Sequence, residues 1–210
     1  MEFGADEAGK GPVLGSMFAA AVRAPRTALP AGLDDSKRLG DDRRERLADR
    51  LRAGDRVAVG VAEVPPERID AGNMNDLTVA AQAEALAAVV ESGDEGLCDA
   101  GDVDADRFAA RVAGRLDADA TVRARHGADA ADDLVAAASV LAKSARESHV
   151  AALEAEYGAV GSGYPSDPTT RAFLREHVAT TGDLPACARE SWATCEDVLA
   201  AAEQSALGEF

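Results

Sequence analysis

Two carboxylates and a cation bracketed by glycines lie together near the start of the chain. Asp6 and Glu7 end a short apolar run, and Gly9-Lys10-Gly11 follows at once. Hard divalent cations bind oxygen ligands, and Mg²⁺ typically uses one or two carboxylates together with substrate phosphate oxygens. Glycine lets a ligand approach the main chain closely. The spacing therefore favours a divalent metal beside a phosphate, and the alternative is an acidic hairpin turn with a surface lysine.

Two more acids occupy similar places further along the chain. Asp99 ends the apolar run 96–100, and Asp129 follows the expected strand 121–125. Acids gathered at one edge of a sheet repel each other unless cations lie between them. Two divalent ions roughly 3.5–4 Å apart would remove that repulsion and would activate a water and stabilise a leaving oxygen in phosphoryl transfer. We therefore predict a two-metal site that binds Mg²⁺ or Mn²⁺ through Asp6, Glu7, Asp99 and Asp129.

A long helix is expected to begin at Asp129 and to run to about Tyr157. Residues spaced by three and four along a helix share one face, and this face begins with acids beside the strand ends. No Ser-His or Cys-His pair suited to nucleophilic catalysis is evident in the sequence. The residues that share the face are Asp129, Asp132, Ala136, Ser139 and Lys143.

The segment 35–39 precedes another helical pattern that passes through Leu51. Ser36 and Lys37 at its start have two interpretations. They would cap a surface helix, or they would meet a phosphate at the helix N-terminus, where free N–H groups favour anions. The sequence alone leaves both open.

The order of the predicted elements indicates an α/β fold with a five-stranded mixed sheet flanked by helices. Three strands come first, strands and helices alternate next, and the C-terminal part is helical. We expect a catalytic core over 1–158, a helical subdomain over 159–203 and a tail over 204–210. Asn75 and Asp104 are predicted helix caps. The expected strands cover 2–6, 16–22, 56–62, 96–100 and 121–125, and the last helix is expected over 189–203.

The chain is strongly acidic and poor in lysine. Its 210 residues carry a formal net charge of −16, and its three lysines are Lys10, Lys37 and Lys143. Strong acidity normally disfavours a nucleic-acid partner, because phosphates attract Lys and Arg. It also fits a protein that works in molar salt, where self-repulsion is screened. All three lysines fall within the motifs described here, which favours specific roles for them.

The sequence predicts an intracellular, cytoplasmic protein. Apolar runs are too short and too often interrupted by charges for a membrane helix. The acidic motif begins almost at once, which argues against a signal peptide. The three cysteines lack the spacing of a metal finger and are expected to be reduced thiols.

These motifs, in this order, resemble archaeal-type ribonuclease HII, a type 2 ribonuclease H, and the composition resembles that of a protein from a halophile. The resemblance implies the ribonuclease H fold for the core and cleavage of the RNA strand of RNA/DNA hybrids. It also implies incision 5′ of a single ribonucleotide in duplex DNA, with 3′-hydroxyl and 5′-phosphate products. The related ribonuclease HIII is disfavoured, since there is no room before Asp6 for its extra domain. The resemblance rests on DEAGKGPVLG (6–15), DSKRL (35–39), DAGDVDADRF (99–108), HGAD (126–129), AAASVLAKSAR (136–146) and GSGYPSDPTTRAF (161–173).

The resemblance also implies roles for individual residues. The four acids match the metal-binding set of the family. Gly9-Lys10-Gly11 matches a Gly-Arg-Gly loop that contacts the ribonucleotide's 2′-hydroxyl and the adjacent phosphate. Here lysine keeps the charge but lacks the planar guanidinium. Tyr164 matches a tyrosine that stacks at the RNA–DNA junction. Ser139 and Lys143 match phosphate-contacting positions of the family. Ser36 and Lys37, at the start of the helical pattern described above, are the other expected phosphate contacts.

The tail resembles the motif by which replication proteins bind the sliding clamp. Leu207 and Phe210 lie three residues apart, as an aliphatic and an aromatic side chain that fill one pocket, and Gln204 stands where the motif has glutamine. The alternative is a frayed C-terminus. We expect a monomer, with a sliding clamp as the protein partner that this tail would bind.

Two other classes of function compete with the nuclease. One is a clamp-tethered module that binds hybrid duplexes without cutting them, and four acids that repel phosphate argue against it. The other is a metal-dependent phosphatase on small substrates. The long elements that lead to the site fit a polymer substrate better.

Overall fold

The computed structural model describes residues 1–33 and 40–207, with the backbone alone for 205–207. The chain forms two compact units, each built from segments that are not contiguous in sequence. The first unit comprises 1–8, 18–63 and 74–146, and the second comprises 9–17, 64–73 and the chain from 147 onward. The division expected from the sequence is different, because it uses contiguous ranges. That division into a core, a helical subdomain and a tail (1–158, 159–203 and 204–210) stays a prediction.

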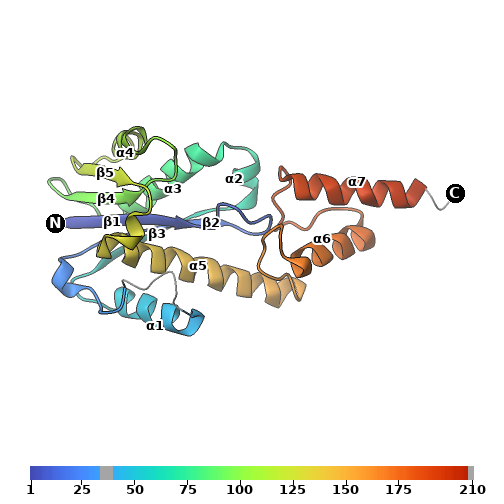
Figure 1. The fold of residues 1–210 in the computed structure, drawn as a ribbon, viewed down its shortest axis with the longest axis horizontal. Helices are drawn as coiled ribbons and strands as arrows, with labels where there is room; N and C mark the ends of the chain where they lie inside the picture. Colours follow the sequence, from blue (N-terminus) through green and yellow to red (C-terminus); the bar gives the residue numbers. More distant parts are fainter. Residues whose placement is uncertain (34–39, 208–210) are drawn as a thin grey trace. The chain divides into compact units, whose positions relative to one another are not determined.

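A five-stranded mixed sheet forms the centre of the first unit (Figure 1). The strand order is β3-β2-β1-β4-β5. Strand β1 pairs antiparallel with β2 and parallel with β4, and β4 pairs parallel with β5. This confirms the mixed sheet expected from the sequence. The strands are β1 Glu2–Ala8, β2 Met17–Arg23, β3 Ala58–Val64, β4 Glu95–Asp99 and β5 Thr121–Arg125.

Helices cover both faces of this sheet. In Figure 1, α1 and α5 lie on one face, and α3 and α4 lie on the other. Alanine and leucine side chains from β2, α1 and α5 form a buried core between sheet and helices. Gly4 on β1 allows α5 to approach, since an added Cβ would lie 2.3 Å from the main chain of Leu134. The helices of this unit are α1 Asp41–Arg52, α3 Met74–Ala87, α4 Ala105–Ala113 and the first half of α5 Asp133–Tyr157.

Several local predictions need correction. Asp129 lies in a 3₁₀ turn, Ala128–Ala130, and not on the long helix, which begins only at Asp133. Asp132 caps the start of α5, because its Oδ1 accepts hydrogen bonds from the amides of Leu134 and Val135 at 2.9 and 3.2 Å. Aspartate favours such capping over a helix interior.

Other helix starts differ by smaller amounts. Helix α3 begins at Met74, so Asn75 lies inside its first turn and is not the cap. The last helix, α7, spans Ala193–Leu207, because Arg189 belongs to the turn before it. The Asp104 cap is confirmed, since its side chain accepts from the amide of Arg107.

The second unit contains the glycine-rich loop and the C-terminal helices. Its core joins Val13 and Leu14 of the loop to apolar side chains of α6 and α7. Main-chain hydrogen bonds hold the same loop, from Val13 N to Gly163 O at 2.8 Å and from Gly15 N to Cys187 O at 2.7 Å. Its further helices are α2 Pro66–Asp70, α6 Pro168–Thr181 and α7 Ala193–Leu207, together with the end of α5.

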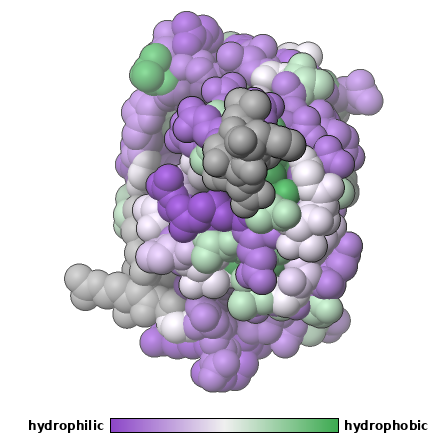
Figure 2. All heavy atoms as spheres, turned by 90° about the vertical axis from the view of Figure 1, so that its right-hand side faces the viewer, coloured by the Kyte–Doolittle hydropathy of each residue, from purple (hydrophilic) through white to green (hydrophobic). Residues whose placement is uncertain are grey.

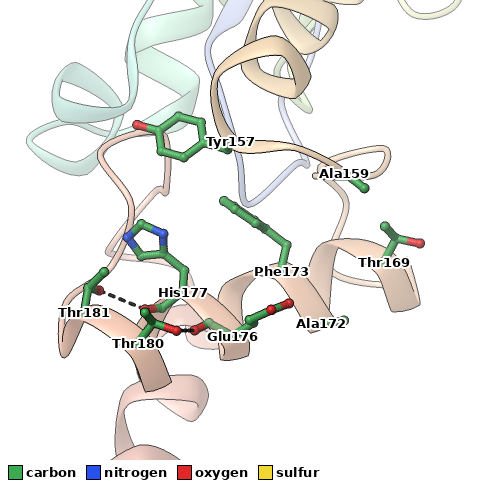
Figure 3. Close-up of a pocket in the computed structure, with 9 residues that line it drawn as sticks. All are labelled: Tyr157, Ala159, Thr169, Ala172, Phe173, Glu176, His177, Thr180 and Thr181. Atoms are coloured by element: carbon green, nitrogen blue, oxygen red, sulfur yellow. Dashed lines mark hydrogen bonds between the residues drawn. The ribbon is translucent and has the colours of Figure 1, made fainter.

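A pocket of about 480 Å³ lies within the second unit (Figure 3). Tyr157, Phe173 and His177 line it with rings 5.8–6.2 Å apart. None of the site residues predicted from the sequence is among its lining residues. Figure 2 looks at this unit from the C-terminal end of α7 and shows hydrophilic residues over most of that face.

The three cysteines are buried and free, in accord with the expected thiols. Among the helices of residues 1–33 and 40–207, not one has the length and apolar character needed to cross a membrane.

Candidate active site

The parallel pairing of β1 and β4 brings three of the predicted acids to one edge of the sheet. Ala5 pairs with Cys98, and the next residues along these strands are Asp6 and Asp99. Glu7 follows on β1. The carboxyl ends of parallel strands lie at the same edge, so the prediction from strand ends places these acids correctly relative to one another.

Alternation along β1 sends its two adjacent acids to opposite faces. Asp6 shares the face of Gly4, against which α5 packs, and Asp6 is only 5% exposed. Glu7 lies on the other face, where the side-chain amide of Gln82 on α3 donates to its Oε2 at 2.5 Å. Each acid therefore meets a different helix.

Asp129 joins the group through its turn. The amide of Ala128 donates to Asp99 Oδ1 at 2.6 Å, which ties the 3₁₀ turn to the end of β4. Asp129, the next residue, is 7% exposed. The carboxylate of Asp99 thus holds in place the segment that carries the fourth acid.

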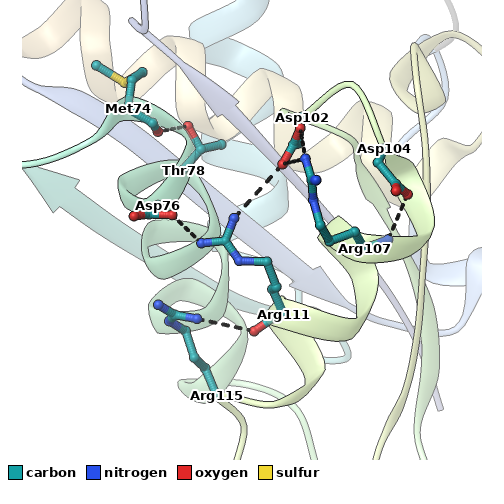
Figure 4. Close-up of polar contacts among 8 residues, drawn as sticks. All are labelled: Met74, Asp76, Thr78, Asp102, Asp104, Arg107, Arg111 and Arg115. Atoms are coloured by element: carbon teal, nitrogen blue, oxygen red, sulfur yellow. Dashed lines mark hydrogen bonds and ion pairs between the residues drawn. The ribbon is translucent and has the colours of Figure 1, made fainter.

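Ion pairs fix the loop that follows Asp99 (Figure 4). Asp102 is buried and accepts two hydrogen bonds from Arg107 Nη2, at 2.7 and 2.8 Å. Arg111 on α4 pairs with Asp76 on α3 and lies 3.9 Å from Asp102. These contacts link β4 to both helices on that face and so hold the strand end where Asp99 stands.

The electrostatics of the group centre on Asp6. Burial raises the pKa of Asp6, the charges of Glu7 and Asp99 raise it further, and the result is about 8. The amide of Glu7 opposes this by donating to Asp6 Oδ1 at 2.7 Å. The hydroxyl of Ser139, on α5, also lowers the pKa of Asp6. Within the described residues, however, Ser139 Oγ makes no hydrogen bond of ordinary geometry. Additional positive charge would stabilise the ionised form.

The donor set fits a hard divalent cation. Four carboxylates supply oxygen ligands of the kind that Mg²⁺ and Mn²⁺ bind, and a cation would offset the repulsion at Asp6. Within residues 1–33 and 40–207, no three carboxylate, imidazole or thiol groups are already arranged around one metal position. Their oxygens accept hydrogen bonds from protein donors instead, as Glu7 does from Gln82 and Asp99 from Ala128.

The glycine-bracketed loop follows Ala8 and belongs to the second unit. Gly9 has φ of +90°, a conformation that favours glycine. Tyr164 lies beside this loop, because a Cβ added to Gly11 would be 3.4 Å from its ring. Tyr164 is 39% exposed. The structure therefore places Tyr164 beside the loop Gly9-Lys10-Gly11.

A buried arginine, which the sequence did not single out, holds this loop. Arg189 is fully buried, and its guanidinium donates to the carbonyl oxygens of Gly9 at 2.6 Å, Lys10 at 3.0 Å and Gly15 at 2.8 Å. Its Cζ lies 5.1 Å from the Trp192 ring centroid. An arginine that follows the apolar pair Cys187-Ala188 and comes three residues before the lone tryptophan, Trp192, was the available signal.

The remaining predicted residues are placed as follows. Ser139 and Lys143 lie one turn apart on α5, Ser139 fully buried and Lys143 partly exposed. Gln204 is exposed on α7, and Leu207 is the last residue of that helix. Ser36, Lys37 and Phe210 lie outside the described residues.

Asp6→Asn is expected to stabilise the metal-free protein at pH 9 and to change its stability little at pH 4. The pKa of Asp6 in the folded protein is about 8 against an ordinary 3.8. Between these values the folded protein holds a proton that the unfolded chain has lost, so the stability of the wild type falls as pH rises through this window. Asparagine removes that loss. Thermal unfolding from pH 4 to pH 9 in EDTA and high KCl measures it.

The matched control is Asp117→Asn, which alters an exposed acid in the same unit. Its midpoint should follow the wild type at every pH. An Asp6→Asn profile parallel to the wild type would contradict the assignment of a raised pKa to Asp6.

The sequence matches the family model described as Ribonuclease HII over residues 3–195. Ribonuclease HII of Natronomonas pharaonis is 65% identical over 207 residues, which cover 99% of this chain and 98% of that protein. Ribonuclease HII of Haloarcula marismortui is 63% identical over 212 residues, which cover all of both chains.

Two solved structures are similar to the whole chain. Ribonuclease H2 from Pyrococcus horikoshii OT3 has a TM-score of 0.89 and 34% identity, over 97% of this chain and 99% of that one. A chain of the PCNA:RNase HII complex from Archaeoglobus fulgidus has a TM-score of 0.83 and 35% identity, over 94% and 96%. Because these matches span nearly its whole length, the chain belongs to the ribonuclease HII family and is a ribonuclease H enzyme.

Proposed function

We propose that this enzyme cleaves the RNA strand of RNA/DNA hybrids and incises 5′ of single ribonucleotides in duplex DNA, leaving 3′-hydroxyl and 5′-phosphate ends. The observation that carries the proposal is the gathering of Asp6, Glu7 and Asp99 at one sheet edge, with Asp129 tied to Asp99 through Ala128. Such a group has little value to a protein that only binds phosphates, because it repels them.

The four acids are proposed to hold Mg²⁺ or Mn²⁺. A bound pair of such ions would supply an activated water and would stabilise the leaving oxygen. The acids' own part is to offer oxygen ligands from a rigid sheet edge. The Gln82 amide orients Glu7, and the Ala128 amide orients Asp99. These contacts limit the motion of the ligands before substrate arrives.

The loop Gly9-Lys10-Gly11 is proposed to recognise the ribonucleotide. Arg189 draws the carbonyl oxygens of Gly9 and Lys10 towards itself. In a planar trans peptide the N–H points opposite to the C=O, so the amides of Lys10 and Gly11 point away from the guanidinium. Those amides are suited to contact a 2′-hydroxyl or phosphate, and the 2′-hydroxyl is what distinguishes RNA from DNA.

Other contacts are proposed along the duplex. Tyr164, with its half-exposed ring beside Gly11, would pack against a sugar or base. Lys143 would meet a phosphate. Ser139 is proposed for the same role. Because Ser139 is completely buried, this contact requires a rearrangement when substrate binds. Ser36 and Lys37 are proposed phosphate contacts at the start of the segment before α1.

The net charge of −16 is proposed to reflect work in concentrated salt. There self-repulsion is screened, and phosphate contacts formed by a few lysines replace a broad basic surface. The enzyme is proposed to be a monomer and to work in the cytoplasm.

The first test is cleavage of duplex DNA that contains one ribonucleotide, in high KCl with Mg²⁺ or Mn²⁺. A single metal-dependent cut 5′ of the ribonucleotide is expected. The cleavage rate of Asp99→Asn should fall by much more than the roughly 10–100-fold that is typical when a residue that only supports a metal ligand is lost. The reason is that this variant removes a proposed carboxylate ligand itself. Gel analysis of end-labelled strands measures both the position of the cut and its rate.

Asp117→Asn serves again as the exposed-acid control and should cleave at the wild-type rate. Binding of the duplex without a cut under every metal and salt condition would favour the non-catalytic module. Turnover of small phosphate esters in place of the duplex would favour the phosphatase.

Arg189→Lys is expected to lower kcat/KM for the same duplex about tenfold, which corresponds to roughly 1.4 kcal/mol. Lysine keeps the charge but lacks the planar fork, and it leaves loop carbonyls without their donor. The control Arg175→Lys, on the exposed side of α6, should match the wild type. Cleavage rates are compared at a temperature where circular dichroism finds all three proteins folded. Equal rates for both variants would mean that Arg189 does not hold the loop for catalysis.

A sliding clamp is the proposed partner of the tail. The similar Archaeoglobus fulgidus structure is that of a PCNA:RNase HII complex, and Gln204, Leu207 and Phe210 of this chain have the spacing of a clamp-binding motif. Removal of 204–210 should abolish binding to the clamp in calorimetry and leave cleavage of a short duplex unchanged. Undiminished binding by the truncated protein would place the contact elsewhere.

A further inference from the structure

Gln82 is a fully buried polar residue on the alanine-rich helix α3. Its side-chain Nε2 donates two hydrogen bonds, to Glu7 Oε2 at 2.5 Å and to the main-chain oxygen of Asp99 at 2.9 Å. One amide group thus joins the acid at the end of β1 to the residue that ends β4. Its neighbours on the helix, Ala81 and Ala83, are buried apolar residues.

The two acceptors determine which way the amide is turned. Nε2 has two hydrogens, and both a carboxylate oxygen and a carbonyl oxygen need a donor. The flipped amide would set Oε1 against two acceptors and would lose both hydrogen bonds. In the observed orientation Oε1 is buried and, among the described residues, has no hydrogen-bond partner. The hydrogen bond to Glu7 is therefore kept, although Oε1 of the same amide is buried without a hydrogen bond from the described residues.

A neutral donor has a particular consequence for Glu7. An arginine or lysine in this place would orient the carboxylate but would also cancel its charge. The amide of Gln82 fixes one carboxylate oxygen and leaves the negative charge of Glu7 available to a cation. Partners of this kind orient metal ligands in many proteins, and their loss typically costs about 10–100-fold in metal affinity or activity.

We propose that Gln82 is a positioning residue that holds Glu7 in the orientation needed to bind divalent metal, and that couples it to the end of β4 beside Asp99. This inference rests on the proposed metal site. Gln82 acts through Glu7 and Asp99 and has no contact of its own with substrate in the proposal.

The test compares Gln82→Met with Thr78→Val in the full-length protein. Methionine has a similar length and no donor. Thr78 is also fully buried on α3, one turn away, and its hydroxyl donates to Met74 O at 2.8 Å (Figure 4). Both variants remove a buried hydrogen-bonding group from the same helix, and Gln82→Met removes in addition the amide that donates to Glu7 Oε2.

Calorimetric titration with MnCl₂ in high KCl gives metal affinity without reference to cleavage. The Kd for Mn²⁺ is expected to rise about tenfold or more in Gln82→Met and to stay at the wild-type value in Thr78→Val. The Mg²⁺ concentration for half-maximal cleavage should rise by the same factor, and the upward shift of the unfolding midpoint on adding MnCl₂ should shrink.

The proposal is overturned if Gln82→Met lowers the metal-free unfolding midpoint but keeps the wild-type Kd for Mn²⁺, because that is the result of a purely structural contact. Should Gln82→Met not fold, Gln82→Asn is used, which keeps the amide but is too short to reach both acceptors, and the same outcomes apply. Wild-type protein that binds no Mn²⁺ would instead contradict the proposed metal site itself.

Discussion

Repulsion between the carboxylates of Asp6, Glu7 and Asp99 is the constraint on which the arrangement of the site depends. The backbone ladder between β1 and β4 holds Asp6 and Asp99 at one sheet edge whether or not their charges favour it. Burial and these neighbouring charges raise the pKa of Asp6 to about 8. The sheet relieves part of the conflict by sending Asp6 and Glu7 to opposite faces. A metal ion bound by both, as proposed, would relieve more of it.

In the second unit, a buried cation holds the glycine-rich loop in place. Arg189 has no exposed surface in a protein of net charge −16, and its guanidinium serves three main-chain carbonyls of the glycine-rich loop. A loop with three glycines is conformationally free in isolation, and the rigid guanidinium fork removes that freedom. The loop that is proposed to recognise RNA therefore depends on a residue 180 positions away in sequence from Gly9.

The predictions that succeeded depended on local patterns and on one geometric rule. The five strands follow from short apolar runs, and the grouping of Asp6, Glu7 and Asp99 follows because parallel strands end at one edge. The prediction for Asp129 failed in its details, because spacing by three and four does not reveal that Asp132 caps α5 and leaves Asp129 in a 3₁₀ turn. Gln82 and Arg189 were missed, since their partners Glu7 and Gly9 are distant in sequence.

The sequence by itself determined the family, the sheet, the residues that end its strands and the glycines that permit the loop, since each is written in the order and type of neighbouring residues. Only the tertiary structure decided which group orients each acid, how far Asp6 is removed from water and what fixes the glycine-rich loop. Those properties depend on packed side chains of α3 and α5 in the first unit, on those of the turn before α7 in the second unit, and on the low polarity that packing creates within each unit. Periodicity in a sequence carries no information about such meetings.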